Sequence, residues 1–345
     1  MLVRGELGMS IRYSGLRYDT ATIKKLAKSY KRHLQSLIET LSSTDTCYLT
    51  PSDLSFKGLS EQELSRLNSD NTLEDVYELS PLQEGIYYHW LAEDSSSLYF
   101  EQTSCKVRAK DLNIDKLESA YKALTARHTV LRTSFSTEYA GRSLQIVRKE
   151  VPGNFTYEKL DSQTDERAQV ELIRRQDRER GFDLSKGSQV RLHVIDLSGG
   201  EYEFIWSHHH ILMDGWCVSV LIDDFNELLS AETTGRALNL TTALPYSNYI
   251  SWLRTIDRER SLSYWKHYLE GYSTLAEIPF KAATADTTYV ETSEHLQIDG
   301  DLLKKVNTLC TQLGITQNIF VQGVWGYLLS RYNNTSDVVF GAVVS

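Results

Sequence analysis

The sequence has few cysteines, and none of them are paired closely enough to suggest a covalent or metal framework. Its 345 residues include four cysteines, which are Cys47, Cys105, Cys217 and Cys310. They are far apart and form no CxxC pair, so the pattern supports neither a disulfide framework nor a cysteine-rich zinc site. We expect free thiols.

The sequence also lacks an excess of basic charge and any long apolar run. Asp and Glu outnumber Lys and Arg by 46 to 37, giving a net charge of −9. Proteins that bind nucleic acids or anionic membranes need a basic field, so both classes are disfavoured. No apolar run approaches the roughly 18 residues of a membrane span, and the first ten residues, MLVRGELGMS, lack the apolar core of a signal peptide. We therefore expect a cytoplasmic protein.

What is present is the composition of a folded chain with more than one core. Hydrophobic residues make up 41% and charged residues 24%. This excludes a disordered or low-complexity chain, and the length predicts about two domains. Strand-like and helix-like segments alternate along most of the chain, which predicts a mixed α/β fold.

The first 50 residues differ from the rest in charge. They hold eight Lys or Arg and four Asp or Glu, which is net +4 and leaves −13 for the remainder. The alternating residues 7–13 predict a strand, and residues 22–41 predict an amphipathic helix. A domain boundary near residue 50 is therefore expected, and we assign 42–72 to a linker that carries one short helix.

From residue 73 onward, several elements have sharp signals. Ser80, Pro81 and Gln83 are typical of a helix start, as N-cap, first-turn proline and capping-box residue. The two alternating runs 189–197 and 201–209 predict a hairpin, and a helix is expected over 215–229. Further expected elements are strands at 100–108, 130–136 and 143–149 and helices at 114–127, 163–181, 301–313 and 317–331. The apolar end, 337–344, predicts a strand, and an unpaired terminal strand suggests that the domain is cut short.

One cluster stands out chemically. His208, His209 and His210 are followed by Asp214 and Gly215 where a strand becomes a helix. These residues could be ordinary strand-end residues. They could bind a metal, but no HExxH spacing or cysteine partner accompanies them. In a third interpretation, an imidazole facing a cleft acts on a substrate proton while Asp214 holds the geometry.

These residues resemble the HHxxxDG motif of condensation domains of nonribosomal peptide synthetases. Four other segments agree in order: LSPLQEG at 79–85, RHTVLRTSF at 127–135, YSNYISW at 246–252, where Asn248 replaces the usual Asp, and DVVFGAVVS at 337–345. The segment GELGMSIRYSGLRYD with the following helix is similar to the tail of an epimerization domain, which implies that residues 1–41 are the tail of a preceding domain. The resemblance implies a chloramphenicol-acetyltransferase-like fold of two α/β lobes, with the first lobe complete at 73–245 and a truncated second lobe at 246–345.

The resemblance also implies an activity and roles for residues. A carrier-bound acceptor amine would attack the thioester of a carrier-bound donor, with His210 as the base or positioning group. Asp214 would orient the turn by pairing with Arg132 or, failing that, Arg127. The remaining implied site residues are His209, the oxyanion donor Gly215, the cleft residue Trp216, and Tyr246 and Trp252 of the fourth motif.

The implied partners are carrier domains on both sides and adjacent epimerization and adenylation domains. Phosphopantetheine would be carried by those partners, and we expect no cofactor or metal on this chain. The SPLQEG and HHILMDGWC segments look closer to the subtype that accepts a D-configured donor residue. We expect the chain alone to be inactive. Two alternatives stay open: a free-standing acyl-CoA acyltransferase of the same superfamily, and a noncatalytic carrier-docking module.

Overall fold

The structure is a computed structural model, and it divides the chain into two compact units. It describes residues 2–3, 6–43, 48–92, 98–110, 112–152, 154–160, 165–197, 199–273, 275–279 and 294–342. Unit 1 comprises residues 1–213 and 221–250, and unit 2 comprises residues 214–220 and 251–345. Among the described residues, no helix is long and apolar enough to cross a membrane.

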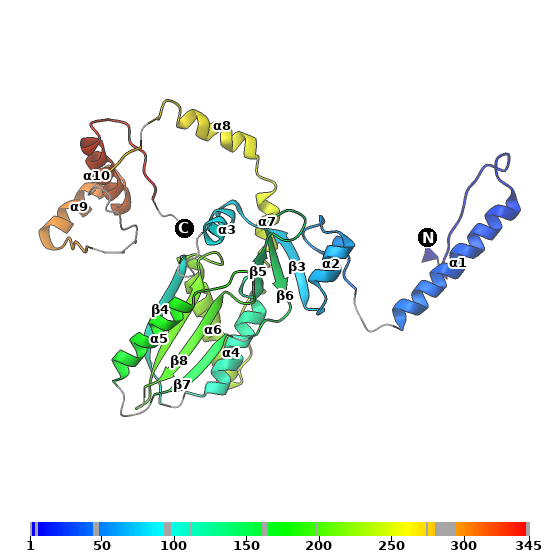
Figure 1. Ribbon diagram of the computed structural model, residues 1–345, viewed down its shortest axis with the longest axis horizontal. Helices are drawn as coiled ribbons and strands as arrows, with labels where there is room; N and C mark the ends of the chain where they lie inside the picture. The colour runs from blue at the N-terminus through cyan, green and yellow to red at the C-terminus, as the bar shows by residue number, and fades with distance from the viewer. Residues whose placement is uncertain are drawn as a thin grey trace. The chain divides into compact units, whose positions relative to one another are not determined.

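The larger sheet of unit 1 has the strand order β4-β9-β8-β7 (Figure 1). Its strands are β4 (Phe100–Arg108), β7 (Phe155–Lys159), β8 (Val190–Asp196) and β9 (Glu201–His209). β8 and β9 are antiparallel neighbours, which confirms the predicted hairpin. Gly200, in its turn, has φ 79°, and a Cβ there would lie 3.0 Å from the carbonyl oxygen of Ala109. Only glycine fits this tight turn without strain.

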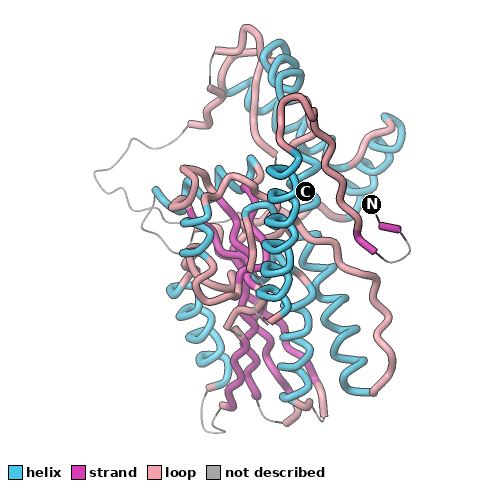
Figure 2. The backbone as a smooth tube through the Cα atoms, turned by 90° about the vertical axis from the view of Figure 1, so that its right-hand side faces the viewer, coloured by secondary structure: helices cyan, strands magenta, loops and turns pink. Residues whose placement is uncertain are grey.

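Helices cover both faces of this sheet, as the alternation along β9 requires (Figure 2). Ile205 packs with Ile173 of α5 (Glu166–Arg180) on one face. Trp206 contacts Tyr121 of α4 (Ile114–Arg127) and Phe225 of α6 (Gly215–Thr234) on the other. The helix predicted at 114–127 is confirmed at both ends. β7, which the sequence analysis missed, runs parallel to β8 at the edge of the sheet.

The smaller sheet of unit 1 has the order β3-β6-β5. Its strands are β3 (Leu73–Glu78), β5 (Thr133–Ser136) and β6 (Leu144–Arg148), and the 3-10 helix η2 (Thr129–Arg132) precedes β5 where the sequence predicted strand from 130. Against it pack the loop that follows the 3-10 helix η1 (Pro51–Asp53) and α2 (Glu61–Leu67). The core there is formed by Leu54, Leu59, Leu64, Leu67, Leu73, Val76, Leu144 and Ile146. The short helix expected in the linker is present, but this stretch is packed into the unit.

Helix α3 (Pro81–Ala92) begins as the capping-box pattern predicts. The Ser80 amide donates to Oε1 of Gln83 at 3.0 Å, and the Gln83 amide donates to Oγ of Ser80 at 3.3 Å. Both side chains are buried. The predicted start of this helix is therefore confirmed.

The amino-terminal part differs from the prediction in one respect. Helix α1 (Thr20–Ser42) is present, and none of its residues is buried. The strand predicted at 7–13 is wrong: pairing ends at Leu7, between β1 (Leu2–Val3) and β2 (Glu6–Leu7). The alternating pattern of 8–13 cannot make a strand there, because a strand also needs hydrogen bonds from a neighbour.

Unit 2 is helical in its described part. It contains the end of α7 (Ser247–Leu253), α8 (Arg258–Tyr268), α9 (Gly300–Leu313) and α10 (Gln317–Tyr332), of which α9 and α10 contact one another. Both late helices were predicted within two residues. The terminal strand predicted at 337–344 is wrong for 337–342, which have no strand structure, and residues 343–344 lie outside the described residues. The described residues of unit 2 contain no strand that could pair with them.

Candidate functional site

The histidine run lies at the end of β9, between two neighbouring strands. His208 pairs with Glu101 of β4 and Val190 of β8, and His209 pairs with Phe100. His208 and His209 are buried, with 5% and 0% of their surface exposed, whereas His210 is half-buried. His210 is therefore the least buried of the three.

The backbone of residues 209–212 is held by hydrogen bonds from several directions. The amides of His209 and His210 donate to carbonyl oxygens of Gln189 at 3.0 Å and Tyr99 at 2.9 Å. The Ile211 amide donates to Nδ1 of the His209 ring at 3.2 Å. Since an amide can only donate, Nδ1 of His209 must be unprotonated, which fixes a neutral ring with its proton on Nε2. The chain around His210 is thus fixed without using the His210 ring.

The two buried histidines are held neutral. Burial lowers the pKa of His208 to about 4, and the neighbouring His210 charge adds to the effect. Burial likewise lowers the pKa of His209 to about 4, followed by the charges of His210 and His208. Because a neutral imidazole has no charge to desolvate, these two rings can pack inside the unit at neutral pH.

One nitrogen of the His210 ring is enclosed. Its Nδ1 atom is buried and has no hydrogen-bond partner among the described residues. The residue as a whole is only half-buried. A half-buried imidazole can accept or donate a proton.

Asp214 is the N-cap of α6. Its Oδ1 accepts from the amides of Trp216 and Cys217, each at 3.1 Å. The Asp214 carboxylate thus caps the first turn of α6, and a negative charge at the start of a helix is stabilising. Apart from the adjacent residues and the backbone of α6, no described atom lies within 4 Å of the position that a Cβ would take on Gly215, and Trp216 is 70% exposed.

Both motif arginines have partners other than the expected one. Arg132 is buried, forms an ion pair with Glu74, and donates to the carbonyl oxygens of Thr125 at 3.0 Å, Ala126 at 3.1 Å, Arg148 and Lys149. Arg127 donates to Asp224. The prediction that one of these arginines pairs with Asp214 is wrong. The guanidinium group of each arginine already donates to another carboxylate and to main-chain carbonyl oxygens.

The segment YSNYISW at 246–252 coincides with α7 (Ser247–Leu253) and the residue before it. The Tyr246 ring lies 6.3 Å from the Tyr77 ring and 5.4 Å from the Tyr249 ring, so it belongs to an aromatic cluster beside the smaller sheet. Trp252, near the other end of α7, is 55% exposed. Neither placement assigns a catalytic role to these two residues.

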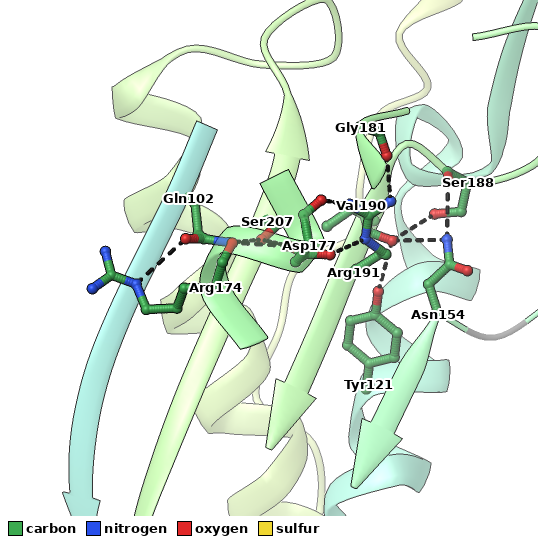
Figure 3. Close-up of polar contacts among 10 residues, drawn as sticks. All are labelled: Gln102, Tyr121, Asn154, Arg174, Asp177, Gly181, Ser188, Val190, Arg191 and Ser207. Carbon is green, nitrogen blue, oxygen red and sulfur yellow. Dashed lines mark hydrogen bonds and ion pairs between the residues drawn. The ribbon is translucent and has the colours of Figure 1, made fainter. Parts of the chain in front are cut away.

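Sequence reasoning missed a polar network that ties α5 to the sheet (Figure 3). Oδ2 of Asp177 accepts from Oγ of Ser207 at 2.6 Å and from Nε2 of Gln102 at 3.0 Å, while Oδ1 lies 2.8 Å from Nε of Arg191. The Arg191 guanidinium also stacks 3.9 Å from the Phe182 ring centre. Burial lowers the pKa of Arg191. This network joins α5 to β4, β8 and β9, and no local motif could reveal it because its members come from four elements.

The remaining features do not add a second candidate site. Two hollows of about 350 and 270 Å³ share Pro152, Asn154 and Ser188 among their lining residues, and a third, of about 420 Å³, is lined by residues between Tyr48 and Asn71. No residue of 208–215 lines any of the three. In the part of the chain that the structure describes, no group of three or more His, Cys, Asp or Glu side chains could hold a metal ion. The histidine run is the candidate site.

Comparisons with known proteins show the family of the chain. A family model described as a condensation domain matches residues 73–345. The chain is 32% identical over 99% of its length to bacitracin synthase 1 of Bacillus licheniformis and 33% identical over 80% of its length to tyrocidine synthase 2 of Brevibacillus parabrevis. It covers 7% and 8% of those proteins, so it spans a small part of the length of the relatives it matches.

Solved structures agree on the fold. The X-domain in its complex with OxyB from teicoplanin biosynthesis matches 76% of this chain and 58% of its own, with TM-score 0.64 and 24% identity. The first condensation domain of the calcium-dependent antibiotic synthetase, in complex with a substrate analogue, matches 77% of this chain and 65% of its own, with TM-score 0.61 and 16% identity. The mixed α/β, chloramphenicol-acetyltransferase-like fold class predicted from the sequence is confirmed.

Proposed function

The chain belongs to the condensation-domain family, and on this premise we propose that it takes part in nonribosomal peptide synthesis by joining a carrier-bound donor to a carrier-bound acceptor. The observation that carries the proposal is His210: a half-buried imidazole with a fixed backbone, directly after a central strand. Its two neighbours are buried and neutral, so His210 is the member of the run that can meet a substrate.

The proposed reaction is aminolysis of a thioester. The amine nitrogen of the acceptor attacks the carbonyl carbon of the donor, a C–N bond forms and the C–S bond breaks. The amine loses a proton, and the leaving thiolate of the donor arm takes one up. Nε2 of His210 accepts the amine proton or holds the amine in line, and the Gly215 amide is a candidate donor to the developing oxyanion.

Magnitudes favour positioning as the main contribution. An α-amino group has a pKa of about 7.7 to 8.0, so roughly a tenth is neutral at pH 7 without any base. A general base typically contributes about 10²- to 10⁴-fold, whereas holding two tethered reactants together can contribute effective molarities of about 10⁵ M or more. We therefore assign His210 a positioning role that includes proton transfer.

The finer proposals concern partners. We propose that carrier domains supply both substrates on phosphopantetheine arms, that adenylation domains elsewhere activate them, and that the setting is cytoplasmic. The match to bacitracin synthase 1 spans 99% of the chain, so the segment before residue 73 has a counterpart there. This supports a preceding domain, which we propose to be an epimerization domain delivering a donor that ends in a D-residue.

A loading assay tests the proposal. The synthetase module that contains this chain is mixed with two carrier domains, one loaded with a dipeptidyl donor ending in a D- or an L-residue and the other with an aminoacyl acceptor. We expect amide product, formed faster with the D-donor, and none when the donor is a coenzyme A thioester. Product from coenzyme A donors would instead select the acyl-CoA acyltransferase, and carrier binding without product would select the docking module.

A further inference from the structure

Gln83 lies in the first turn of α3, and its side chain contacts the backbone carbonyl of Ile211, the residue that follows His210. Gln83 is 4% exposed. Nε2 of Gln83 donates to the carbonyl oxygen of Ile211 at 3.0 Å, and this oxygen belongs to the residue directly after His210. The turn is therefore held at two points: the Gln83 side chain donates to the Ile211 carbonyl, and the Tyr99 carbonyl accepts from the His210 amide.

The orientation of the Gln83 amide is fixed by partners that cannot change roles. Oε1 accepts from the Ser80 amide at 3.0 Å, and a main-chain amide can only donate. Nε2 faces the Ile211 carbonyl, which can only accept. A flipped amide would put two donors together at Ser80 and two acceptors together at Ile211, so only one orientation satisfies both contacts.

A second glutamine holds the first. Gln145 of β6 is fully buried, and its Nε2 donates to Oε1 of Gln83 at 2.9 Å and to the Glu78 carbonyl at 3.2 Å. Nε2 of Gln83 in turn lies 3.2 Å from Oε1 of Gln145. The buried pair therefore joins the smaller sheet, the start of α3 and the histidine turn, with all four amide hydrogens of the pair pointing at acceptors.

We propose that Gln83, held by Gln145, is a positioning residue for His210, a role that deepens the proposed amide-forming function and rests on it. Without the Gln83 donor the Ile211 carbonyl loses its buried partner, and the turn can move to find another. A displacement of about 1 Å at a reacting group can cost on the order of 10²-fold in rate. The capping box of α3 thus serves a second purpose: its glutamine sets the turn that carries the imidazole.

The chain offers variants that separate the two purposes of Gln83. Gln83→Glu keeps an acceptor for the Ser80 amide but presents a carboxylate oxygen to the Ile211 carbonyl. Ser80→Ala removes the hydroxyl of the cap and leaves Ile211 its donor. Gln102→Leu is the matched control for losing a partly buried glutamine, because its amide bonds the α5 network and none of residues 209–212.

The test combines kinetics with hydrogen–deuterium exchange. In the synthetase module, we expect Gln83→Glu and Gln83→Leu to lower kcat for amide formation about 10- to 100-fold with KM changed less than about threefold. In this chain, we expect exchange in the peptide covering 209–213 to speed up about tenfold or more in both variants. Ser80→Ala and Gln102→Leu should leave kcat and exchange at 209–213 near wild type, even where they lower the melting temperature.

Each other outcome overturns one of the two ideas. Unchanged exchange at 209–213 in both Gln83 variants, or a kcat loss no larger than in Gln102→Leu, would overturn the positioning role. Loss of the folded state in both Gln83 variants while Gln102→Leu stays folded would make Gln83 a folding residue and overturn the proposal as well. If the wild-type module forms no amide, the proposed function fails, and the exchange measurement alone still decides whether Gln83 holds the turn.

Discussion

Arg127 donates from Nε to Oδ2 of Asp224 at 2.7 Å, with both side chains less than one-fifth exposed. Nε2 of His128 lies 2.8 Å from the same oxygen. Burial raises the pKa of Asp224, but the hydrogen bonds from Arg127 and His128 outweigh it and hold the pKa below its usual value. The contact fastens the end of α4 to α6, the two helices that pack on Trp206.

We expect Asp224→Ala to destabilise the chain by about 3 to 5 kcal/mol, because it leaves a largely buried arginine without its carboxylate. Urea denaturation followed by circular dichroism measures the loss. Asp223→Ala is the matched control, since Asp223 is the preceding residue on α6 and is exposed. A loss below about 1 kcal/mol, or one equal to that of Asp223→Ala, would contradict this assignment.

Local signals predicted local structure well. The capping box at Ser80, the β8–β9 hairpin and the apolar stripe of α4 each depend on residues close in sequence, and each is confirmed. The failures share a cause. Residues 8–13 have strand-like alternation and residues 337–342 form an apolar run, but neither pattern can supply a hydrogen-bonding neighbour.

The partners of charged side chains could not be predicted from the sequence either. The motif suggested that an arginine would pair with the nearest functional carboxylate, Asp214, yet Arg132 and Arg127 pair with Glu74 and Asp224. An ion pair depends on which elements pack together, and that is set by the whole core. The placement of the histidine run at a strand end was predictable, because it follows from one alternating strand and one helix.

The cap of α6 gives a prediction for Asp214. Asp214→Ala should lower stability by about 0.5 to 2 kcal/mol, because the amides of Trp216 and Cys217 lose their acceptor. Asp214→Asn should lose much less, since asparagine is also a favourable N-cap. Melting temperatures of the two variants and wild type decide, and equal losses for both variants would show that the charge matters more than the cap.

The buried histidines predict how stability depends on pH. Their pKa values are about 4 in the folded chain, against about 6.5 for an unfolded histidine. Between these values the unfolded chain binds more protons, so stability is fully present above about pH 6.5 and falls as the pH drops toward 4. The loss is on the order of 3 kcal/mol for each histidine if the two act independently.

Urea midpoints measured from pH 7.5 to 4.5 test this dependence. The variant His209→Asn keeps an acceptor for the Ile211 amide but does not titrate in this range, so its stability should fall less steeply between pH 6.5 and 4.5. A slope identical to that of the wild-type chain would exclude His209 as a contributor, and the same logic applies to His208→Gln.

The last prediction concerns His210. His210→Ala should lower the rate of amide formation in the synthetase module about 10²- to 10⁴-fold, because the imidazole that the proposal places against the acceptor amine is lost. It should change the melting temperature little, since the ring is half-buried and the backbone bonds of residues 209–212 use none of its atoms. His267→Ala, which removes an exposed imidazole from α8, is the control for an effect of any histidine. Single-turnover assays on carrier-bound donor and acceptor, run beside thermal melts, separate the two effects. A rate within about threefold of wild type would remove His210 from the reaction. A melting temperature lowered as far as that of Asp224→Ala would make His210 a structural residue, because removing a group that lies outside the packed core costs little stability.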